Sequence, residues 1–276
     1  MSTPLKTRFA PTLVAPETYL VHDHMGEGVS PVCVALNALV IRGAEPVVVD
    51  TGEAENREQY LADVFGLVEP EDIRWVFISH DDVDHTGNVN ALMEAAPNAT
   101  LVINWFMRER MNGSLAVSPL RQRWVGDGES LDVGDRVLRA VRPPVFDSPT
   151  TRGLFDPTTG VYWAADTFAT PMAAPVTDVA DLPAGMWEAG MATFANYVSP
   201  WLALVDDRRY QATVDRVAAL APSVLVGCHT PVVRGADRVA TAIDQLRLAP
   251  TATFDPEPGQ AVLEDIQHAM GALVTA

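Results

Sequence analysis

The most constraining feature of the sequence is a short loop that is rich in histidine and aspartate. The loop, Ser79–Asn88, follows the apolar segment Trp75–Ile78, which has the length of a strand, and precedes residues 89–96, which have the pattern of a helix. Proteins of the α/β class place their chemistry in such loops at the carboxyl ends of strands. An acidic loop is often only a solvated surface, but imidazole and carboxylate groups are also the usual ligands of divalent metals. Two histidines that frame the aspartates favour a metal site, with the candidate ligands His80, Asp82, Asp84 and His85.

Length and charge limit the classes of protein to which the chain can belong. Its 276 residues, of which 48% are hydrophobic, are enough for one large domain with a substantial core. The net charge is −17 and there is no basic stripe, which argues against nucleic-acid binding. An anionic substrate would need a local cation to offset this acidic field. We therefore expect a single domain over residues 1–276, with a core at about 19–235 and C-terminal helices at 235–273.

The cysteines and the hydropathy pattern bear on where the chain works. Two cysteines are too few for a disulfide framework, and we expect both Cys33 and Cys228 to be packing residues. No segment approaches the roughly 18 uninterrupted apolar residues of a membrane-spanning helix. The first residues lack the apolar region of a signal peptide. The expected location is therefore the cytoplasm, with no role for a membrane.

Strand hairpins alternate with helices along the chain in two rounds. This pattern predicts two mixed sheets that pack face to face, with helices outside. Residues 1–16 and the proline-rich 250–258 are expected to be irregular, and a bend is expected at Pro200. The expected strands are 19–21, 32–41, 46–49, 75–78, 99–103, 131–141 (as a hairpin), 153–155, 161–165 and 223–226, and the expected helices are 56–65, 89–96, 105–111, 186–204, 208–220, 235–247 and 259–273.

Ligand-type side chains also follow later apolar segments of the chain. Asp166 and His229 each come directly after a predicted strand, and Asp147 lies in a loop that three prolines keep irregular. If the two sheets pack face to face, these ends converge at one edge together with residues 80–85. Each aspartate could instead cap a loop, but several such loops in one chain favour a shared metal site.

Two further polar positions have weaker claims to a functional role. Asp50 ends the strand at 46–49, so it is either an acceptor for loop amides or a group that orients a metal-ligating histidine. The run His22-Asp23-His24 is a second candidate metal cluster, but an ordinary turn follows it and favours a structural interpretation.

The residues at these strand ends resemble the motifs of the metallo-β-lactamase superfamily. The family's HxHxDH motif corresponds to His80–His85, followed by Thr86 and Gly87. The family's later ligands are a third-loop histidine, a bridging aspartate and a final histidine, and Asp166 and His229 match the last two. The resemblance covers roughly residues 19–235. It implies an α/β (α+β) fold, a four-layer αββα sandwich of two mixed β-sheets, with a two-metal site at one edge.

Two departures from the superfamily pattern point to one of its branches. The second motif histidine is Asp82 here, and Asp147 takes the third-loop position when Asp-Ser-Pro-Thr-Thr is aligned with the family's His-Thr-Pro-Gly-Ser. A carboxylate at the second position, usually Glu, is typical of the diiron domain of flavodiiron proteins and of related oxygen-binding diiron proteins. The Asn196-Tyr197 pair is also similar to that branch. Asp147 does not match the common pattern, so the identity of the metal stays open.

The resemblance implies two divalent metal ions that share Asp166. Four carboxylates and three imidazoles without a thiolate suit iron or manganese better than zinc. Iron is therefore the favoured metal, zinc and manganese are kept open, and no bound flavin is expected. The first ion would be bound by His80, Asp82, Asp147 and Asp166, and the second by Asp84, His85, His229 and Asp166.

Three functions are open for such a centre. The favoured one is a diiron protein that binds or reduces dioxygen or nitric oxide, like a flavodiiron-type domain without its flavin module, with electrons from a separate donor protein. An oxygen sensor without catalysis is one alternative. The other is a hydrolase of an ester, lactone or thioester, in which Asp84 or Asp166 holds a metal-bridging hydroxide and Arg142 and Arg152 grip an anionic group. A homodimer is also kept open.

Overall fold

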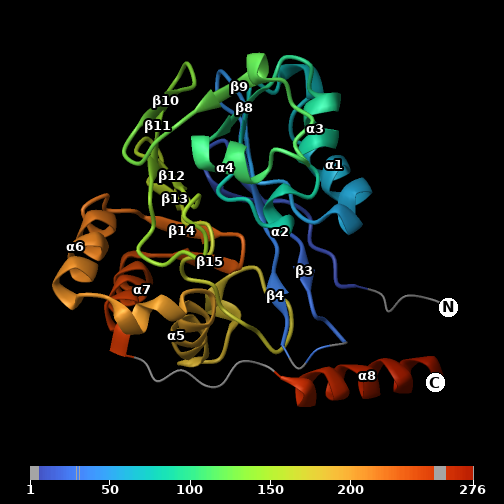
Figure 1. Ribbon diagram of the computed structural model, residues 1–276, viewed down its shortest axis with the longest axis vertical. Coiled ribbons are helices and arrows are strands. Elements are labelled where there is room, and N and C mark those ends of the chain that lie inside the picture. Colours follow the sequence, from blue (N-terminus) through green and yellow to red (C-terminus); the bar gives the residue numbers. More distant parts are fainter. Residues whose placement is uncertain (1–5, 29, 31, 252–258, 276) are drawn as a thin grey trace.

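The computed structural model describes residues 6–28, 30, 32–251 and 259–275 and arranges them around two mixed β-sheets (Figure 1). Across the first sheet the strands follow the order β1 (Thr12–Ala15), β2 (Thr18–Val21), β5 (Ala38–Ile41), β6 (Val47–Val49), β7 (Trp75–Phe77), β8 (Thr100–Ile103) and β9 (Gln122–Trp124). Across the second sheet the order is β10 (Ser130–Asp132), β11 (Val137–Val141), β12 (Gly153–Asp156), β13 (Val161–Trp163), β14 (Val224–Gly227) and β15 (Thr230–Arg234). A separate hairpin pairs β3 (His24–Met25) with β4 (Val34–Ala35).

The direction of each strand explains its composition. In the first sheet β6, β7, β8 and β9 run parallel, whereas β1, β2 and β5 add to it antiparallel. In the second sheet only β13 and β14 are parallel. Central parallel strands are covered on both faces, so they consist of continuous apolar runs, whereas the parallel edge strand β9 is polar and mostly exposed. The valines of β6 and the run Val224–Val226 of β14 are all buried, as this rule requires.

Helices cover the outer face of each sheet and complete the four layers. Buried side chains of the first sheet pack against α1 and α3, and those of the second sheet pack against α5, α6 and α7 (Figure 1). The α-helices are α1 (Arg57–Phe65), α2 (Val83–Thr86), α3 (Val89–Ala95), α4 (Trp105–Arg110), α5 (Met186–Val198), α6 (Asp207–Ala218), α7 (Ala236–Leu248) and α8 (Gln260–Thr275). The 3-10 helices are η1 (Ala54–Asn56), η2 (Pro70–Asp72), η3 (Pro119–Arg121), η4 (Val179–Asp181), η5 (Pro200–Leu204) and η6 (Ala249–Thr251). The prediction of an αββα sandwich is confirmed.

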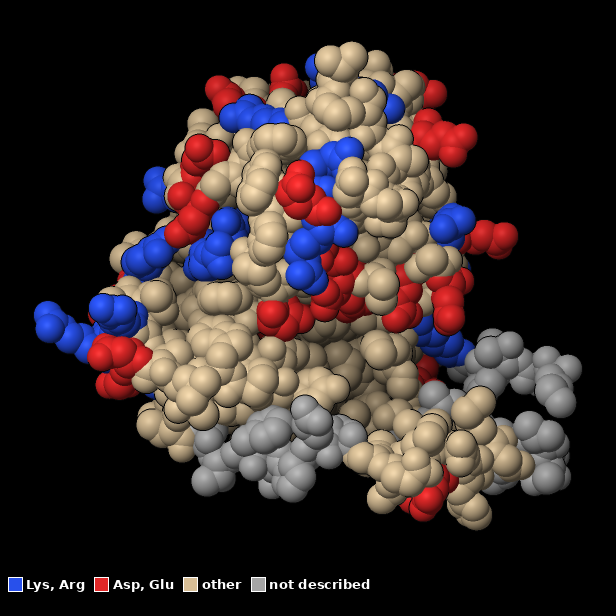
Figure 2. Space-filling view, viewed as in Figure 1, with Lys and Arg blue, Asp and Glu red and all other residues tan. Residues whose placement is uncertain are grey.

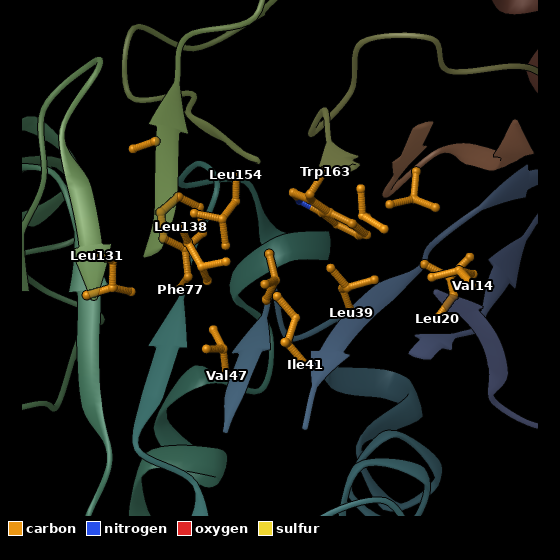
Figure 3. Packing of buried hydrophobic residues seen from close by; sticks show 14 of the residues in the cluster. Val14, Leu20, Leu39, Ile41, Val47, Phe77, Leu131, Leu138, Leu154 and Trp163 are labelled. Carbon is orange, nitrogen blue, oxygen red and sulfur yellow. The ribbon is translucent and has the colours of Figure 1, made fainter. Parts of the chain in front are cut away.

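The central core lies between the facing sheets. Figure 3 shows Leu39 and Phe77 of the first sheet opposite Leu138, Leu154 and Trp163 of the second. Each large apolar side chain that is fully buried contributes about 1.5–3 kcal/mol relative to an exposed one. This layer therefore fixes the two sheets against each other, and the loops at their shared edge gain fixed positions.

Several elements differ from the sequence prediction. The expected strand at 32–41 is divided into β4 and β5, and the side-chain amide of Asn37 between them donates to the carbonyl oxygens of Gly227 and Thr230 at 3.1 and 3.0 Å. Residues 12–15, expected to be irregular, form β1 because they pair with β2. Neither β9 nor β15 was predicted: β9 has only three residues and pairs with β8, and β15 is the return strand of a tight hairpin with β14, in which Gly227 pairs with Thr230.

The C-terminal part agrees with the prediction where it is described. The long helix expected at 186–204 ends at Val198, and η5 follows after the break at Pro200. The helix predicted at 259–273 corresponds to α8, which Figure 1 shows apart from the sandwich. Most of the proline-rich segment 250–258 lies outside the described residues, as does the start of segment 1–16. No helix in the described ranges has both the length and the apolar content to cross a membrane.

Candidate metal centre

The predicted ligands come from four loops and meet at one edge of the two sheets. The first sheet contributes the loop after β7 together with α2, and the second contributes the loops that follow β11, β13 and β14. Their side chains form three groups in which the ligand atoms lie within 4.8 Å of one another. These groups contain every predicted ligand: His80, Asp82, Asp84, His85, Asp147, Asp166 and His229.

Asp166 lies at the centre of this cluster, and its two oxygens face different histidines. Its Oδ2 is 3.3 Å from Nε2 of His80. Its Oδ1 is 3.2 Å from Nε2 of His85 and 3.5 Å from Nε2 of His229. A carboxylate in this position can give one oxygen to each of two metal ions. The arrangement fits the bridging role that the sequence suggested.

One side of Asp166 is open to solvent. Here Nε2 of His80 lies 3.8 Å from an oxygen of Asp82 and 3.8 Å from an oxygen of Asp147. The side chains of Asp82 and Asp147 are 46% and 25% exposed, whereas that of His80 is fully buried. A small ligand would reach the cluster from this side.

The other side of Asp166 is more enclosed. The Oδ2 atom of Asp84 is 3.2 Å from Nε2 of His229 and 3.5 Å from Nε2 of His85. The half-buried ring of Phe194 lies 5.5 Å from the ring of His229, measured between centroids, and shields it. The buried thiol of Cys228 belongs to the same group, which sequence reasoning missed because it treated this cysteine as packing.

The outer nitrogen of each histidine is bound to the protein, so the inner nitrogen is free for a metal. Nδ1 of His229 lies 2.8 Å from the carbonyl oxygen of Ala35, and Nδ1 of His85 lies 2.9 Å from Oδ2 of Asp50. Nδ1 of His80 lies 3.2 Å from the hydroxyl of Ser79. Acceptors at Nδ1 favour the tautomer whose Nε2 lone pair can bind a cation.

Three buried atoms at the centre are left without a hydrogen bond. They are Nε2 of His80, Nε2 of His85 and Oδ1 of Asp166, and none has a partner within the described part of the chain. Buried polar atoms without partners are costly and rare in native proteins. All three atoms are ligand types for iron, manganese or zinc. The donor set therefore fits a resident pair of metal ions.

Asp50 anchors the loop that carries the histidines. Its carboxylate accepts hydrogen bonds from the backbone N–H and the hydroxyl of Ser79, each at 2.6 Å, and from the indole N–H of Trp163 at 3.1 Å. It also contacts Nδ1 of His85. Asp50 therefore accepts from a loop amide and contacts a histidine, and both are contacts that the sequence suggested. Asp50 has φ +59°, a conformation that Asp tolerates better than most residues.

Close packing holds α2 in place. The carbonyl oxygen of His85 accepts from the backbone N–H of Thr51 at 2.8 Å, and the side chain of Asn88 donates to the carbonyl oxygen of Thr51 at 2.7 Å. A Cβ on Gly87 would come within 2.4 Å of the backbone nitrogen of Ala54, so only glycine fits there. Thr51 and Asn88 were not predicted, because nothing in their local sequence marks them.

Backbone strain accompanies the central carboxylate. Ala165 and Phe168 have φ values of +53° and +71°, in the left-handed region that residues with a side chain rarely adopt. Such strain costs about 1–3 kcal/mol per residue and is found mainly at functional sites. The packing around this loop overcomes that cost and turns Asp166 toward the histidines.

The mutual charges of the cluster shift the pKa of its buried groups. Burial lowers the pKa of His80, but the charge of Asp166, its hydrogen bond and the charge of Asp147 together outweigh burial and raise the pKa above its usual value. The pKa of His85 and that of His229 are raised well above normal in the same way, by the charges around them. Burial would raise the pKa of Asp166, yet the three histidines hold it well below its usual range. Burial raises the pKa of Asp147 to about 6. Without metal the imidazoles keep protons, which a metal ion would displace.

The second candidate cluster, at residues 22–24, does not gather around a common point. The carboxylate of Asp23 is bound to Lys6 and to the side chain of Asn56. Nε2 of His24 contacts Glu27 at 2.9 Å, and Nε2 of His22 contacts the hydroxyl of Thr12 at 2.8 Å. These contacts agree with the structural interpretation of this run.

Comparison with known proteins places this geometry among related folds. The family model described as ODP family beta lactamase matches residues 34–229. The Putative diflavin flavoprotein A 2 of Nostoc sp. is 32% identical over 133 residues, which cover 48% of this chain and 23% of the relative. The Rubredoxin-oxygen oxidoreductase of Megalodesulfovibrio gigas is 25% identical over 225 residues, which cover 81% of this chain and 55% of the relative.

Solved structures share the fold at low sequence identity. The rubredoxin oxygen:oxidoreductase from Desulfovibrio gigas superimposes with a TM-score of 0.74 at 19% identity, over 87% of this chain and 61% of that chain. The flavodiiron protein from Giardia intestinalis gives a TM-score of 0.74 at 16% identity, over 88% of this chain and 60% of that chain. The matched region is thus about a quarter to three fifths of the length of these relatives.

Proposed function

Because the chain belongs to the family described as ODP family beta lactamase, we propose that it is a diiron protein that binds and reduces dioxygen or nitric oxide. One observation carries the proposal: Asp166 lies between two groups of ligands, with buried histidine and carboxylate atoms that lack partners. The names of the relatives support the same direction, since one is a rubredoxin-oxygen oxidoreductase and one a flavodiiron protein.

The proposed ligand sets follow the two sides of Asp166. One ion would be held by His80, Asp82, Asp147 and Asp166, and the other by Asp84, His85, His229 and Asp166. Four carboxylates neutralise two divalent cations and favour oxygen-preferring metals, so we take iron as the resident metal. Bound iron would supply the redox chemistry for a diatomic gas at this centre.

The residues of the chain have distinct tasks in this proposal. Asp84 and Asp166 would face the reacting molecule and fix the separation of the two ligand sets. Asp50, the hydroxyl of Ser79 and the carbonyl oxygen of Ala35 hold the imidazole rings at their outer nitrogens. The ring of Phe194 shields one side from water, so the approach lies on the side of Asp82 and Asp147.

Electrons would come from a separate donor protein. We propose that the centre works without a flavin bound to these residues. We also propose that residues 1–276 form one metallo-β-lactamase-like unit. A donor would have to approach the edge where the four loops meet, because electron transfer needs proximity to the metal ligands. A gas sensor would share the site but would not consume its ligand.

The test is metal content combined with gas consumption. Protein made in iron-supplied medium should contain about two iron ions per chain, and with a chemical reductant it should consume dioxygen or nitric oxide. Asp166→Ala should abolish both results, whereas Asp244→Ala, an exposed aspartate of α7, should leave them unchanged. Zinc that iron cannot replace, or one metal at full occupancy, would overturn the diiron proposal. Gas binding without consumption would instead indicate the sensor, and rapid ester hydrolysis without gas chemistry the hydrolase.

A further inference from the structure

A cavity lies beside the loop that carries Asp147. Its volume is about 520 Å³, within the range of about 300–1,000 Å³ that is usual for small-molecule sites. It is formed where α4, the end of β9 and the end of β11 come together, and Asp147 itself is not part of its wall. The side chains that matter for its chemistry are Trp105, Phe106, Trp124, Glu129, Arg142 and Arg152.

One part of the wall consists of aromatic rings that face water. Trp105 is 56% exposed and Trp124 is 49% exposed, which is unusual for so large an apolar side chain. The rings of Trp105 and Phe106 are nearly parallel, at 18° and 6.0 Å between centroids. Exposed aromatic surface of this kind is a platform on which a flat ring can stack.

Another part of the wall consists of two arginines whose guanidinium groups form no ion pair with any described residue. Arg152 is only 9% exposed, and its guanidinium donates to the carbonyl oxygen of Thr151 at 2.7 Å, while its Nε has no partner within the described ranges. Arg142 donates to the carbonyl oxygen of Pro149 at 3.0 Å and lies over the ring of Phe146 at 5.1 Å. A guanidinium offers five N–H donors, so most of those on this pair remain available.

The charges around Arg142 and Arg152 also favour an anionic ligand. Burial and the neighbouring charge of Arg142 lower the pKa of Arg152 to about 10, which reflects the cost of burying a cation, and the charge of Asp127 opposes this shift only in part. Glu129 accepts from the backbone N–H of Gly126 at 2.7 Å, and Asp127 pairs with Arg216 at 2.8 Å and accepts from the backbone N–H of Arg142 at 2.6 Å. Figure 2 shows Lys and Arg atoms beside Asp and Glu atoms in the middle of one face of a molecule whose net charge is −17.

We propose that this cavity binds a small aromatic oxyanion, with its ring on Trp105 and Trp124 and its carboxylate or phosphate on Arg142 and Arg152. The anion would supply the charge that the two guanidinium groups lack. Arginine suits this task because its planar fork matches two oxygens at once. The site goes beyond the proposed gas chemistry, because no metal ligand takes part in it.

The same loop connects the cavity with the metal centre. The hydroxyls of Ser148 and Thr150 both donate to Oδ1 of Asp81 at 2.7 Å, and the backbone N–H of Arg152 donates to the carbonyl oxygen of Ser79 at 2.8 Å. Asp147 precedes Ser148 directly. A ligand on Arg142 and Arg152 would therefore rest on the segment that positions Asp147.

The test uses calorimetric titration of the metal-loaded protein with four probes. 2-Naphthoate and 2-naphthyl phosphate carry both a ring and an oxyanion, and the comparison between them tells whether a carboxylate or a phosphate is preferred. 2-Naphthylmethanol keeps the ring without charge, and inorganic phosphate keeps the charge without a ring. At least one of the first two should bind saturably with a Kd below about 1 mM, and both partial probes should bind at least about tenfold more weakly.

Variants separate this cavity from anion binding at the metals. Arg142→Gln should weaken the better probe about tenfold or more, because a charge-assisted hydrogen bond is lost. Trp105→Ala, an exposed position, should also weaken it, whereas Arg139→Gln, an exposed arginine of β11, which ends just before Arg142, should not. Equal affinity in Arg142→Gln and the unaltered protein, no saturable binding of either ring anion, or equal binding of the uncharged ring would overturn the proposal.

Discussion

At the scale of single residues, Asp166 combines contacts that no other carboxylate of the cluster has. Its oxygens lie within 3.5 Å of three different imidazoles, whereas Asp147 is near His80 alone. We therefore predict that Asp166→Ala loses both metals, because each ligand set loses its shared member. Asp147→Ala should weaken only the set that contains His80. Elemental analysis after dialysis measures both results, and two metals retained in Asp166→Ala would contradict the bridging role.

Asp50 allows a test of positioning without contact to the metals. Asp50→Asn keeps the size of the side chain and its tolerance for φ +59°, but it removes the charge that faces Nδ1 of His85. Loss of such a partner typically weakens metal binding about 10- to 100-fold. We predict this loss for the ligand set of His85, measured by competition with a chelator. Asp50→Glu, which restores the charge but not the length, should recover only part of the affinity, and unchanged binding in Asp50→Asn would contradict the role.

Candidate ligands could be predicted from the sequence where the residue type alone indicates metal binding. His80 and His85 stand out because histidine and aspartate rarely gather in one loop without a reason. Cys228 was not recognised, since a cysteine beside a candidate ligand histidine looks the same in the sequence whether it packs or faces the metal ligands. Nor does the sequence reveal that Arg152 is buried without an acidic partner, because burial depends on segments far away in the chain.

At the scale of elements, the long apolar runs were predictable and their ends were not. The run at 32–41 has uniform strand character, but Asn37 divides it by donating to a turn almost two hundred positions later, at Gly227 and Thr230. The three residues of β9 are too few to show a period, and only the pairing with β8 makes them a strand. The five residues of β15 become a strand through the hairpin with β14, directly after the loop of Cys228 and His229. Local propensity thus gives the type of an element, and tertiary hydrogen bonds set its limits.

His22 directly follows β2 and contacts Thr12 of β1, and it makes the free energy of unfolding depend on pH. Burial lowers the pKa of His22 to about 4 from an unfolded value near 6.5, with smaller opposing contributions from Asn37 and Asp63. Between these values the unfolded chain binds more protons than the folded one, so stability rises with pH from about 4 to about 6.5. The total change from this group is about 3 kcal/mol.

We therefore predict that His22→Gln unfolds with less acid sensitivity than the unaltered chain. Urea unfolding at several pH values between about 4 and 6.5 would measure it, as a shallower decline of the free energy of unfolding toward acid. Taking the difference between the two proteins removes the contribution of the carboxylates at the centre. His268→Gln, at an exposed position of α8, should follow the unaltered chain. Parallel pH curves for His22→Gln and the unaltered chain would contradict the prediction.

At the scale of the whole molecule, the order of elements was the most predictable feature. Two rounds of strands and helices require two sheets with helices outside, because each element must bury one face. The same argument brings the strand ends to one edge, so the ligands could be expected to meet. The proline-rich loop around Asp147 could not be placed by periodicity, and its position depends on Ser148 and Thr150 binding Asp81.

The division of the ligands between the two halves determines how metal should stabilise the molecule. Residues 80–85 belong to the first sheet, whereas Asp147, Asp166 and His229 belong to the second. At this edge the halves are joined mainly by polar contacts, such as the backbone bond from Arg152 to Ser79 at 2.8 Å and that from Asn37 to Cys228 at 2.8 Å. The apolar core lies deeper between the sheets (Figure 3). A pair of metal ions would therefore link the two halves at this edge.

We predict that chelation loosens this edge before it loosens the outer helices. Hydrogen exchange should rise at least about tenfold in peptides that cover residues 147–152 and 227–230, because bound metal at a thousandfold excess over its Kd adds about 4 kcal/mol to stability. Peptides from α6 should change much less, since Val214 and Val217 are fixed by apolar packing that needs no metal. Adding iron back should restore the slow exchange. An equal rise in the exchange rate in α6 and at the edge would show that the metals support global stability alone. No rise at either place would show that metal ions do not link the two halves.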